Sequence, residues 1–242
     1  MPAASSSYWS TSRSHRYSLL FALPLLLLYE LLALVAPVEM AGGVIRNGAD
    51  VLLTGVFVAL IGPRGPAVFM TIVIGGALYL IWRDRHPTPM RPRVFAMMLG
   101  ESAVLAVLFG LVVGTATLQL LGPLRVLSAG GMPDSALSRL TLSLGAGLYE
   151  ELLFRVVLVA LLARGFCLLG MSRVHGGIIA TFLGALLFSA FHYIGSLGEP
   201  WQLESFTFRF LAGLAFSALY LTRGFGITAW THALYDVAVL LG

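Results

Sequence analysis

The sequence predicts an all-α polytopic transmembrane bundle, and three observations support this fold class. Hydrophobic residues make up 58% of the 242 residues and charged residues only 11%, against about 25% charged residues in soluble domains. The mean hydropathy is +0.91. Apolar runs of about 20 residues, long enough to cross a bilayer, recur along the chain. We therefore expect one membrane domain over residues 1–242, with no room for a separate soluble domain.

The apolar runs predict seven spans and one short interfacial or re-entrant helix. The first run lacks a small-residue cleavage site and is longer than a signal-peptide core, so we expect it to be retained. The run at 49–61 is short for a crossing, and the sequence GPRGP that follows it breaks a helix. We place the short helix there, and the spans at 17–37, 66–82, 94–121, 140–163, 174–194, 205–221 and 226–241.

The basic residues indicate topology rather than a nucleic-acid partner. All 15 of them are arginine, the net charge is +4, and they are scattered singly or in pairs between the spans instead of forming a basic face. Arg13 and Arg16 precede the first span and predict a cytoplasmic N-terminus. We expect an integral protein of a bacterial inner membrane, in contact with lipid and without a nucleic-acid partner.

Glu150, Glu151 and Arg155 are the only charged residues in the run at 140–163. An ionised side chain at the centre of a span costs about 2.5 to 3.5 kcal/mol, so such residues usually face an inner cavity. Glu151 and Arg155 are four residues apart and can form an ion pair. Glu150 points about 100° away, so its partner must come from another helix or from water. The alternative is a structural ion cluster that ties helices together.

Two later spans each carry a histidine with a companion four residues away. Phe188 and His192 share one face of the run at 174–194, and His232 and Asp236 share one face of the last run. Hydrogen-bonded pairs that order helix packing are the alternative interpretation. An unpaired carboxylate, two imidazoles and a second carboxylate are sufficient to activate a water molecule. The sequence therefore predicts a hydrolase rather than a binding site.

These motifs, in the order EExxxR, FxxxH and HxxxD, resemble the CPBP family of intramembrane endopeptidases. That family includes the type II CAAX prenyl proteases and the bacteriocin-processing or Abi proteins. The resemblance covers residues 140–242, the motif-bearing core, whereas the N-terminal spans at 1–139 contribute only hydropathy. It implies cleavage of a peptide bond near a membrane-embedded or lipidated segment, in a membrane-associated peptide or lipidated protein.

The resemblance also implies a role for each motif residue. Glu150 and His192 would position and deprotonate the attacking water, and Arg155 would hold Glu151. His232 and the residue at 236 would stabilise the oxyanion.

At position 236 many members of the family have Asn, although Asp also occurs. An ionised Asp236 cannot donate a hydrogen bond, so Asp236 must be protonated or must orient His232. Both interpretations remain open at this point.

A metal site is a conditional alternative. Some members of the family have been described as metalloproteases, and His192 and His232 with a carboxylate could bind one Zn²⁺. The sequence contains no HExxH motif, and these ligands would come from separate helices. We therefore expect a glutamate-activated water without a cofactor.

Two other classes of protein are compatible with intramembrane charges. A proton-coupled transporter would use Glu30, Glu101, Glu150 and the intramembrane histidines, but it predicts repeats with broken helices at matching positions, which the sequence does not show. A catalytically silent scaffold predicts that Glu150 contributes to stability as much as to function.

Overall fold

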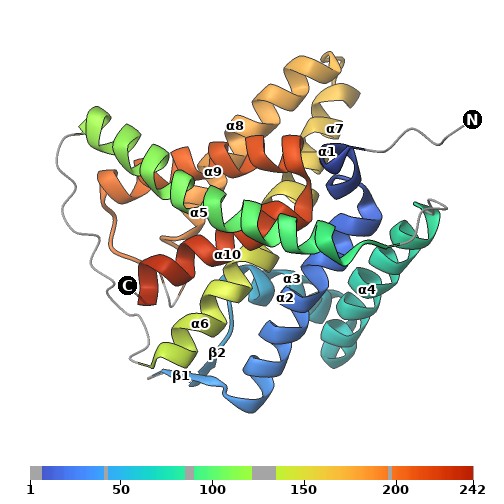
Figure 1. Ribbon diagram of the computed structural model, residues 1–242. Helices are drawn as coiled ribbons and strands as arrows, with labels where there is room; N and C mark the ends of the chain where they lie inside the picture. Colours follow the sequence, from blue (N-terminus) through green and yellow to red (C-terminus); the bar gives the residue numbers. More distant parts are fainter. Residues whose placement is uncertain (1–6, 41–42, 85–89, 122–134, 196–197, 242) are drawn as a thin grey trace, which may run out of the picture.

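The computed structural model describes residues 7–40, 43–84, 90–121, 135–195 and 198–241. This part of the chain is a bundle of α-helices (Figure 1), which confirms the predicted fold class. Two π-helical stretches, Ala146–Glu150 and Leu152–Val159, join α6 to α7. The helices are α1 (Tyr8–Ser12), α2 (His15–Val35), α3 (Gly48–Ile61), α4 (Gly65–Arg83), α5 (Pro92–Leu121), α6 (Ala136–Gly145), α7 (Ala160–Leu168), α8 (Arg173–Phe191), α9 (Leu203–Arg223) and α10 (Phe225–Leu241).

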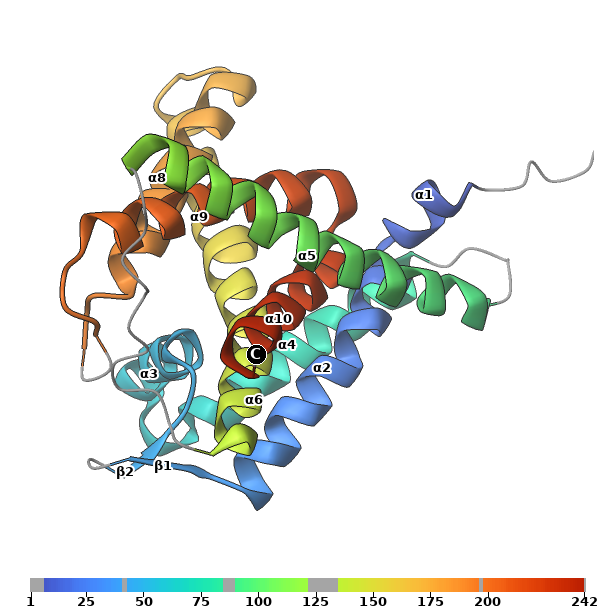
Figure 2. The same ribbon diagram turned by 60° about the vertical axis from the view of Figure 1, so that its left-hand side comes forward.

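Helix α10 lies at the centre of the bundle, in contact with α2, α5, α6 and α9 (Figure 2). Its side chains at Thr228, Ala229 and Ala233 are fully buried and small, which lets neighbouring helices approach closely. The π-helical stretch Ala146–Glu150 packs closely against these small residues of α10. A Cβ atom added to Gly147 would lie 2.6 Å from the backbone nitrogen of Ala233. The last helix is therefore pressed against the segment that carries the paired glutamates.

Five helical segments among the described residues are long and apolar enough to cross a membrane: 15–35, 48–83, 92–121, 173–191 and 203–223. Large apolar side chains are exposed along α2, α4 and α5, for example Leu34, Leu78 and Val107. An apolar exterior of this kind is typical of contact with lipid. The runs expected at 140–163 and 226–241 are helical but are not among the five, so the count of seven spans stays a prediction.

The segment 48–83 is a pair of helices rather than one straight rod. The chain reverses at Gly62–Arg64, where Gly62 has a φ of 73°, a left-handed conformation that favours glycine. Helix α3 then packs against α4, and a Cβ atom on Gly65 would lie 2.5 Å from the carbonyl carbon of Phe57. The helix break predicted from GPRGP is confirmed. The interfacial or re-entrant position of α3 stays a prediction.

The structure corrects several details. A short antiparallel hairpin, Val38–Met40 with Gly43–Ile45, interrupts the helical pattern between α2 and α3. Its β-branched residues fit an extended strand better than a helix. The helical segment expected at 140–163 extends from Ala136 to Leu168. The one expected to reach residue 194 ends at Phe191, because the chain turns before Gly195, which has a φ of 87°. The residues 122–134, expected to form most of an outer loop, lie outside the described residues.

Candidate active site

Glu150 and Glu151 lie where the two π-helical stretches meet. Such turns are rare and occur frequently at functional sites, because the widened turn changes the direction of the side chains. Both glutamates are buried, with exposed fractions of 6% and 0%. Although adjacent in sequence, they have entirely different partners.

The two oxygens of Glu150 are not equivalent. Oε1 accepts a hydrogen bond of 2.9 Å from the Nδ2 atom of Asn47. Oε2 lies 3.9 Å from Nε2 of His192 and accepts no hydrogen bond from any residue that the structure describes. A separation of 3.9 Å is too long for a direct hydrogen bond, but one water molecule can bond to both atoms at once. Glu150 therefore keeps one oxygen available to a water molecule.

His192 does not lie inside a helix, as the sequence predicted, but forms the C-cap of α8. Its Nδ1 atom lies 2.9 Å from the backbone oxygen of Phe188. Because a carbonyl oxygen only accepts hydrogen bonds, Nδ1 carries a proton and donates it to this bond. In the neutral ring, Nε2 is then an acceptor, and it is the nitrogen that faces Glu150. The spacing of four residues in FxxxH thus sets the orientation of the imidazole.

Glu151 belongs to a second cluster, in which only its Oε1 atom has partners, whereas Oε2 is buried and has no hydrogen-bond partner among the described residues. Its Oε1 atom lies 3.1 Å from Nη1 of Arg155, in the ion pair that the sequence spacing predicts. The same oxygen accepts a hydrogen bond of 2.7 Å from Nδ1 of His232. Arg155 also donates to the backbone oxygen of Gly213 at 3.2 Å, and its guanidinium carbon lies 4.5 Å from the ring centre of Phe188. All three charged or titratable side chains are buried. The cluster ties the glutamate helix to α9 and α10.

His232 joins this cluster to Asp236. Its ring stacks on Phe216, with ring centres 4.3 Å apart and planes 20° apart. With Nδ1 bonded to Glu151, Nε2 faces Asp236, and 3.6 Å separates it from Oδ2. That distance exceeds a hydrogen bond. Asp236 is about a quarter exposed, so Nε2 and this carboxylate border the accessible side of the cluster.

The structure brings the six predicted site residues together in two neighbouring groups, Glu150 with His192, and Glu151 with Arg155, His232 and Asp236. The EExxxR helix, the end of α8 and α10 supply them, as the order of motifs predicts. The boundaries expected from sequence placed Glu150 near mid-span and His192 near the outer end of its span. In the structure their side chains lie only 3.9 Å apart, so the two reactive groups are at a similar depth.

Sequence reasoning missed Asn47. An Asn followed three residues later by Asp50 is a signal for the start of a helix, and Asn47 is indeed the N-cap of α3. Nothing in the sequence links it to a glutamate 103 residues further on.

Metal ligands are not gathered at this site. Among the residues that the structure describes, no group of three or more His, Cys, Asp or Glu side chains is arranged to hold a metal ion. Of the two histidines considered for zinc, His232 uses Nδ1 to bond Glu151 and His192 uses Nδ1 to bond a backbone oxygen.

Residues 133–238 match the model of a family described as Rce1-like, type II CAAX prenyl endopeptidase. The matched region contains the six predicted site residues and excludes Asn47. No curated protein and no solved structure matches the chain.

Proposed function

We propose that this chain, whose residues 133–238 belong to the family of type II CAAX prenyl endopeptidases, cleaves peptides by means of a water molecule activated by Glu150 and His192. The family implies a protease that acts in a membrane, in agreement with the apolar helices. The observation that supports the mechanism most is the free oxygen of Glu150, 3.9 Å from the acceptor nitrogen of His192. A water molecule between them can donate one hydrogen to each.

The reaction needs one proton acceptor that later becomes a donor. Glu150 takes a proton from the water, and the resulting hydroxide attacks the carbonyl carbon of the scissile peptide bond. The electron pair of the carbonyl double bond moves to its oxygen, which becomes an oxyanion. Glu150 then gives the proton to the departing nitrogen as the C–N bond breaks. His192 orients the water through Nε2 and so makes the attack directional.

His232 is suited to stabilise the oxyanion. In its imidazolium form it donates from both nitrogens, so that Nδ1 serves Glu151 while Nε2 is free to bond the oxyanion. One donor of this kind contributes about 2.7 to 4 kcal/mol to the lowering of the barrier. Asp236 faces the same nitrogen. We assign it, in its protonated form, as a second donor to the oxyanion. Arg155 holds Glu151, and through it His232, in place.

The substrate class follows from the family and from the membrane. We infer a membrane-embedded or lipidated peptide, with a prenylated C-terminal tail as the first candidate. Arg13 before α2 and Arg16 in its first turn support a cytoplasmic N-terminus in a bacterial inner membrane.

Hydrolysis by the purified protein in liposomes tests this function. The probes are a farnesylated peptide that ends in Cys-aliphatic-aliphatic-any residue and an unlipidated transmembrane peptide. We expect the wild type to cleave at least one of them, and Glu150→Ala and His192→Ala to lower the rate at least about 100-fold. The matched control is Glu204→Ala, which removes a carboxylate from the first turn of α9 and should leave the rate unchanged.

Three further measurements separate this function from its alternatives. Thermal unfolding of Glu150→Ala close to that of the wild type would exclude a merely structural role. Activity that survives dialysis against a chelator would support a water activated without zinc. Retained hydrolysis in Glu150→Ala would refute the assignment, and proton-dependent flux without hydrolysis would favour a transporter.

A further inference from the structure

Asn47 is a buried polar residue of the N-terminal half, outside the region that matches the family. We propose that Asn47 is a positioning residue for Glu150, which holds one carboxylate oxygen so that the other faces His192 and the attacking water. The inference rests on the proposed function, because it assigns Asn47 a part in the same hydrolysis. The hydrogen bond of 2.9 Å from Nδ2 of Asn47 to Oε1 of Glu150 carries it.

The direction of this hydrogen bond follows from the capping of α3. The Oδ1 atom of Asn47 accepts the backbone N–H of Ala49 at 2.9 Å, as an N-cap side chain does. The amide oxygen is therefore already used, and the NH₂ group must be the end that faces Glu150. A carboxylate only accepts, so donor and acceptor match without any change of protonation.

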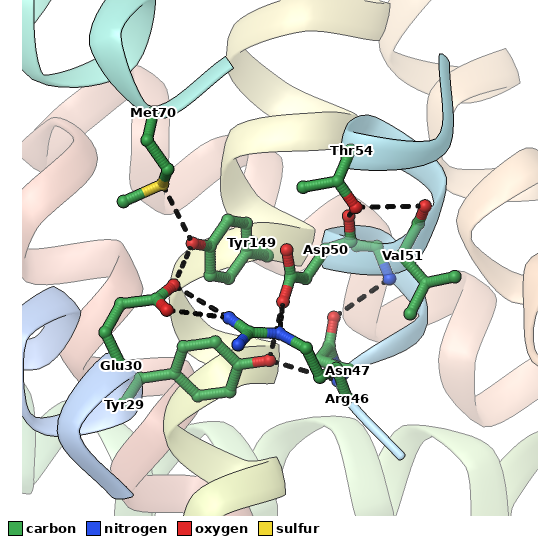
Figure 3. Close-up of polar contacts among 10 residues, drawn as sticks. Tyr29, Glu30, Arg46, Asn47, Asp50, Val51, Thr54, Met70 and Tyr149 are labelled. Atoms are coloured by element: carbon green, nitrogen blue, oxygen red, sulfur yellow. Dashed lines mark hydrogen bonds and ion pairs between the residues drawn. The ribbon is translucent and has the colours of Figure 1, made fainter. Parts of the chain in front are cut away.

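The backbone of Asn47 is held as firmly as its side chain (Figure 3). Its N–H donates to the hydroxyl of Tyr29 at 3.2 Å, and that hydroxyl donates to Asp50 at 2.9 Å. Asp50 is also paired with Arg46, four residues before it. The start of α3, where Asn47 lies, is therefore held by the pair of Arg46 with Asp50 and by hydrogen bonds to Tyr29 of α2.

The same network of hydrogen bonds continues from Arg46 through Glu30 to Tyr149, the neighbour of Glu150 in the chain. Arg46 donates to both oxygens of Glu30, at 2.8 and 2.9 Å. Glu30 in turn accepts a hydrogen bond of 2.5 Å from the hydroxyl of Tyr149, the residue immediately before Glu150 (Figure 3). The donor to Glu150 and the backbone that carries Glu150 are thus parts of one hydrogen-bonded unit.

Packing leaves little room for this unit to shift. A Cβ atom on Gly145 would lie 2.5 Å from the ring of Tyr29 and 2.9 Å from Cβ of Asn47. Only a glycine at this position lets α6 lie so close to the start of α3. The distance between Asn47 and the glutamate helix is therefore set by contact of side chains with backbone as well as by the hydrogen bond.

The chemical consequence concerns the rotation of the carboxylate. With Oε1 bound to a fixed donor, Oε2 is the oxygen that remains for water, and it lies on the side of His192. A displacement of about 1 Å at a reacting group can cost about 100-fold in rate. Loss of the Asn47 donor should therefore reduce the rate of the catalytic step more than it weakens the binding of the substrate.

Asn47→Ser is the variant that tests this, because serine keeps an N-cap oxygen for α3 but is too short to bond both Ala49 and Glu150. We expect kcat to fall about 10- to 100-fold, KM to stay within about twofold of the wild type, and the midpoint of thermal unfolding to change by only a few degrees. The probes are the farnesylated and transmembrane peptides described above. Asn47→Asp keeps the shape and the cap, loses the amide donor, and should also lose activity.

The matched control is Ser172→Ala, which removes the side-chain cap of α8 at the end of the helix opposite His192. It should lower the unfolding midpoint and leave kcat unchanged. A wild-type kcat in Asn47→Ser would overturn the positioning role while leaving the endopeptidase assignment intact. A fall of kcat in proportion to the folded fraction would assign Asn47 a structural role alone. If the wild type itself cleaves neither probe, the proposed function fails and this inference fails with it.

Discussion

Two carboxylates of this protein, the partly buried Glu101 on α5 and the buried Glu150 before α7, differ in how fully their oxygens are used. Glu101 accepts hydrogen bonds from Nε and Nη2 of Arg223, at 2.5 and 2.7 Å, and from the hydroxyl of Tyr8 at 2.5 Å. From the part of the chain that the structure describes, Glu150 accepts one, from Asn47, and its second oxygen faces His192 across 3.9 Å. Arg223, the partner of Glu101, is the last residue of α9.

The surroundings of the two carboxylates continue the contrast. Arg223 is almost fully buried, its guanidinium lies 3.7 Å from the ring centre of Trp9, and it donates to Ser12 at 2.8 Å. The cluster thus binds the N-terminal helix α1 to α5 and α9. Saturation of this kind is what a structural ion cluster requires, because every buried charge is compensated. An oxygen left open beside a histidine is what water activation requires. A glutamate can therefore serve stability or chemistry, depending on whether its carboxylate oxygens still have room to accept hydrogen bonds.

The largest effect on stability should come from Glu101→Ala. It leaves Arg223 buried without its counter-charge, which typically costs about 3 to 5 kcal/mol of unfolding free energy, while the hydrolysis rate per folded molecule stays at the wild-type level. Chemical unfolding in detergent measures the first quantity and the peptide assay the second. The double variant Glu101→Leu with Arg223→Met should regain much of the loss, because no unpaired charge remains. An unchanged unfolding free energy in Glu101→Ala would show that the pair of Glu101 with Arg223 does not stabilise the fold, in contradiction of its structural role.

A smaller effect is expected from Tyr8→Phe, which removes one donor to Glu101. We expect a loss of about 1 kcal/mol, in the range of a single hydrogen bond. Burial, together with the hydrogen bond to Glu101, raises the pKa of Tyr8 to about 12, against about 10 in an unfolded chain. The contribution of this group is therefore complete below about pH 10 and is lost as the pH rises toward about 12. Thermal unfolding between these values should show a smaller decline for Tyr8→Phe than for the wild type.

The smallest effect should come from Asp236→Asn. If Asp236 acts as a protonated donor, an amide can replace it, and kcat should stay within about threefold of the wild type. Asp236→Leu, which cannot donate, is the control and should lower kcat about 100-fold or more. A large loss in Asp236→Asn would show instead that the carboxylate is needed as an acceptor, to orient His232.

Much of the site was predictable because it depends on local spacing. Glu151 and Arg155 pair at four residues, and Phe188 orients His192 at the same interval, as helical geometry dictates. The helix break was likewise readable from the two prolines and two glycines of residues 62–66. The hairpin at 38–45 and the end of α8 before His192 were not predicted, since hydropathy alone does not distinguish a short apolar strand or turn from the end of a span.

The sequence by itself determined that this is a helical membrane protein with costly charges at intramembrane positions, because hydropathy and helical periodicity depend only on neighbouring residues. Only the tertiary structure decided which distant residues meet the two adjacent glutamates. Oε1 of Glu151 meets Arg155 and His232 of α10, whereas Oε1 of Glu150 accepts a hydrogen bond from Asn47 of the N-terminal half. Contacts between residues so far apart in the chain depend on how the helices pack, and no local pattern encodes them.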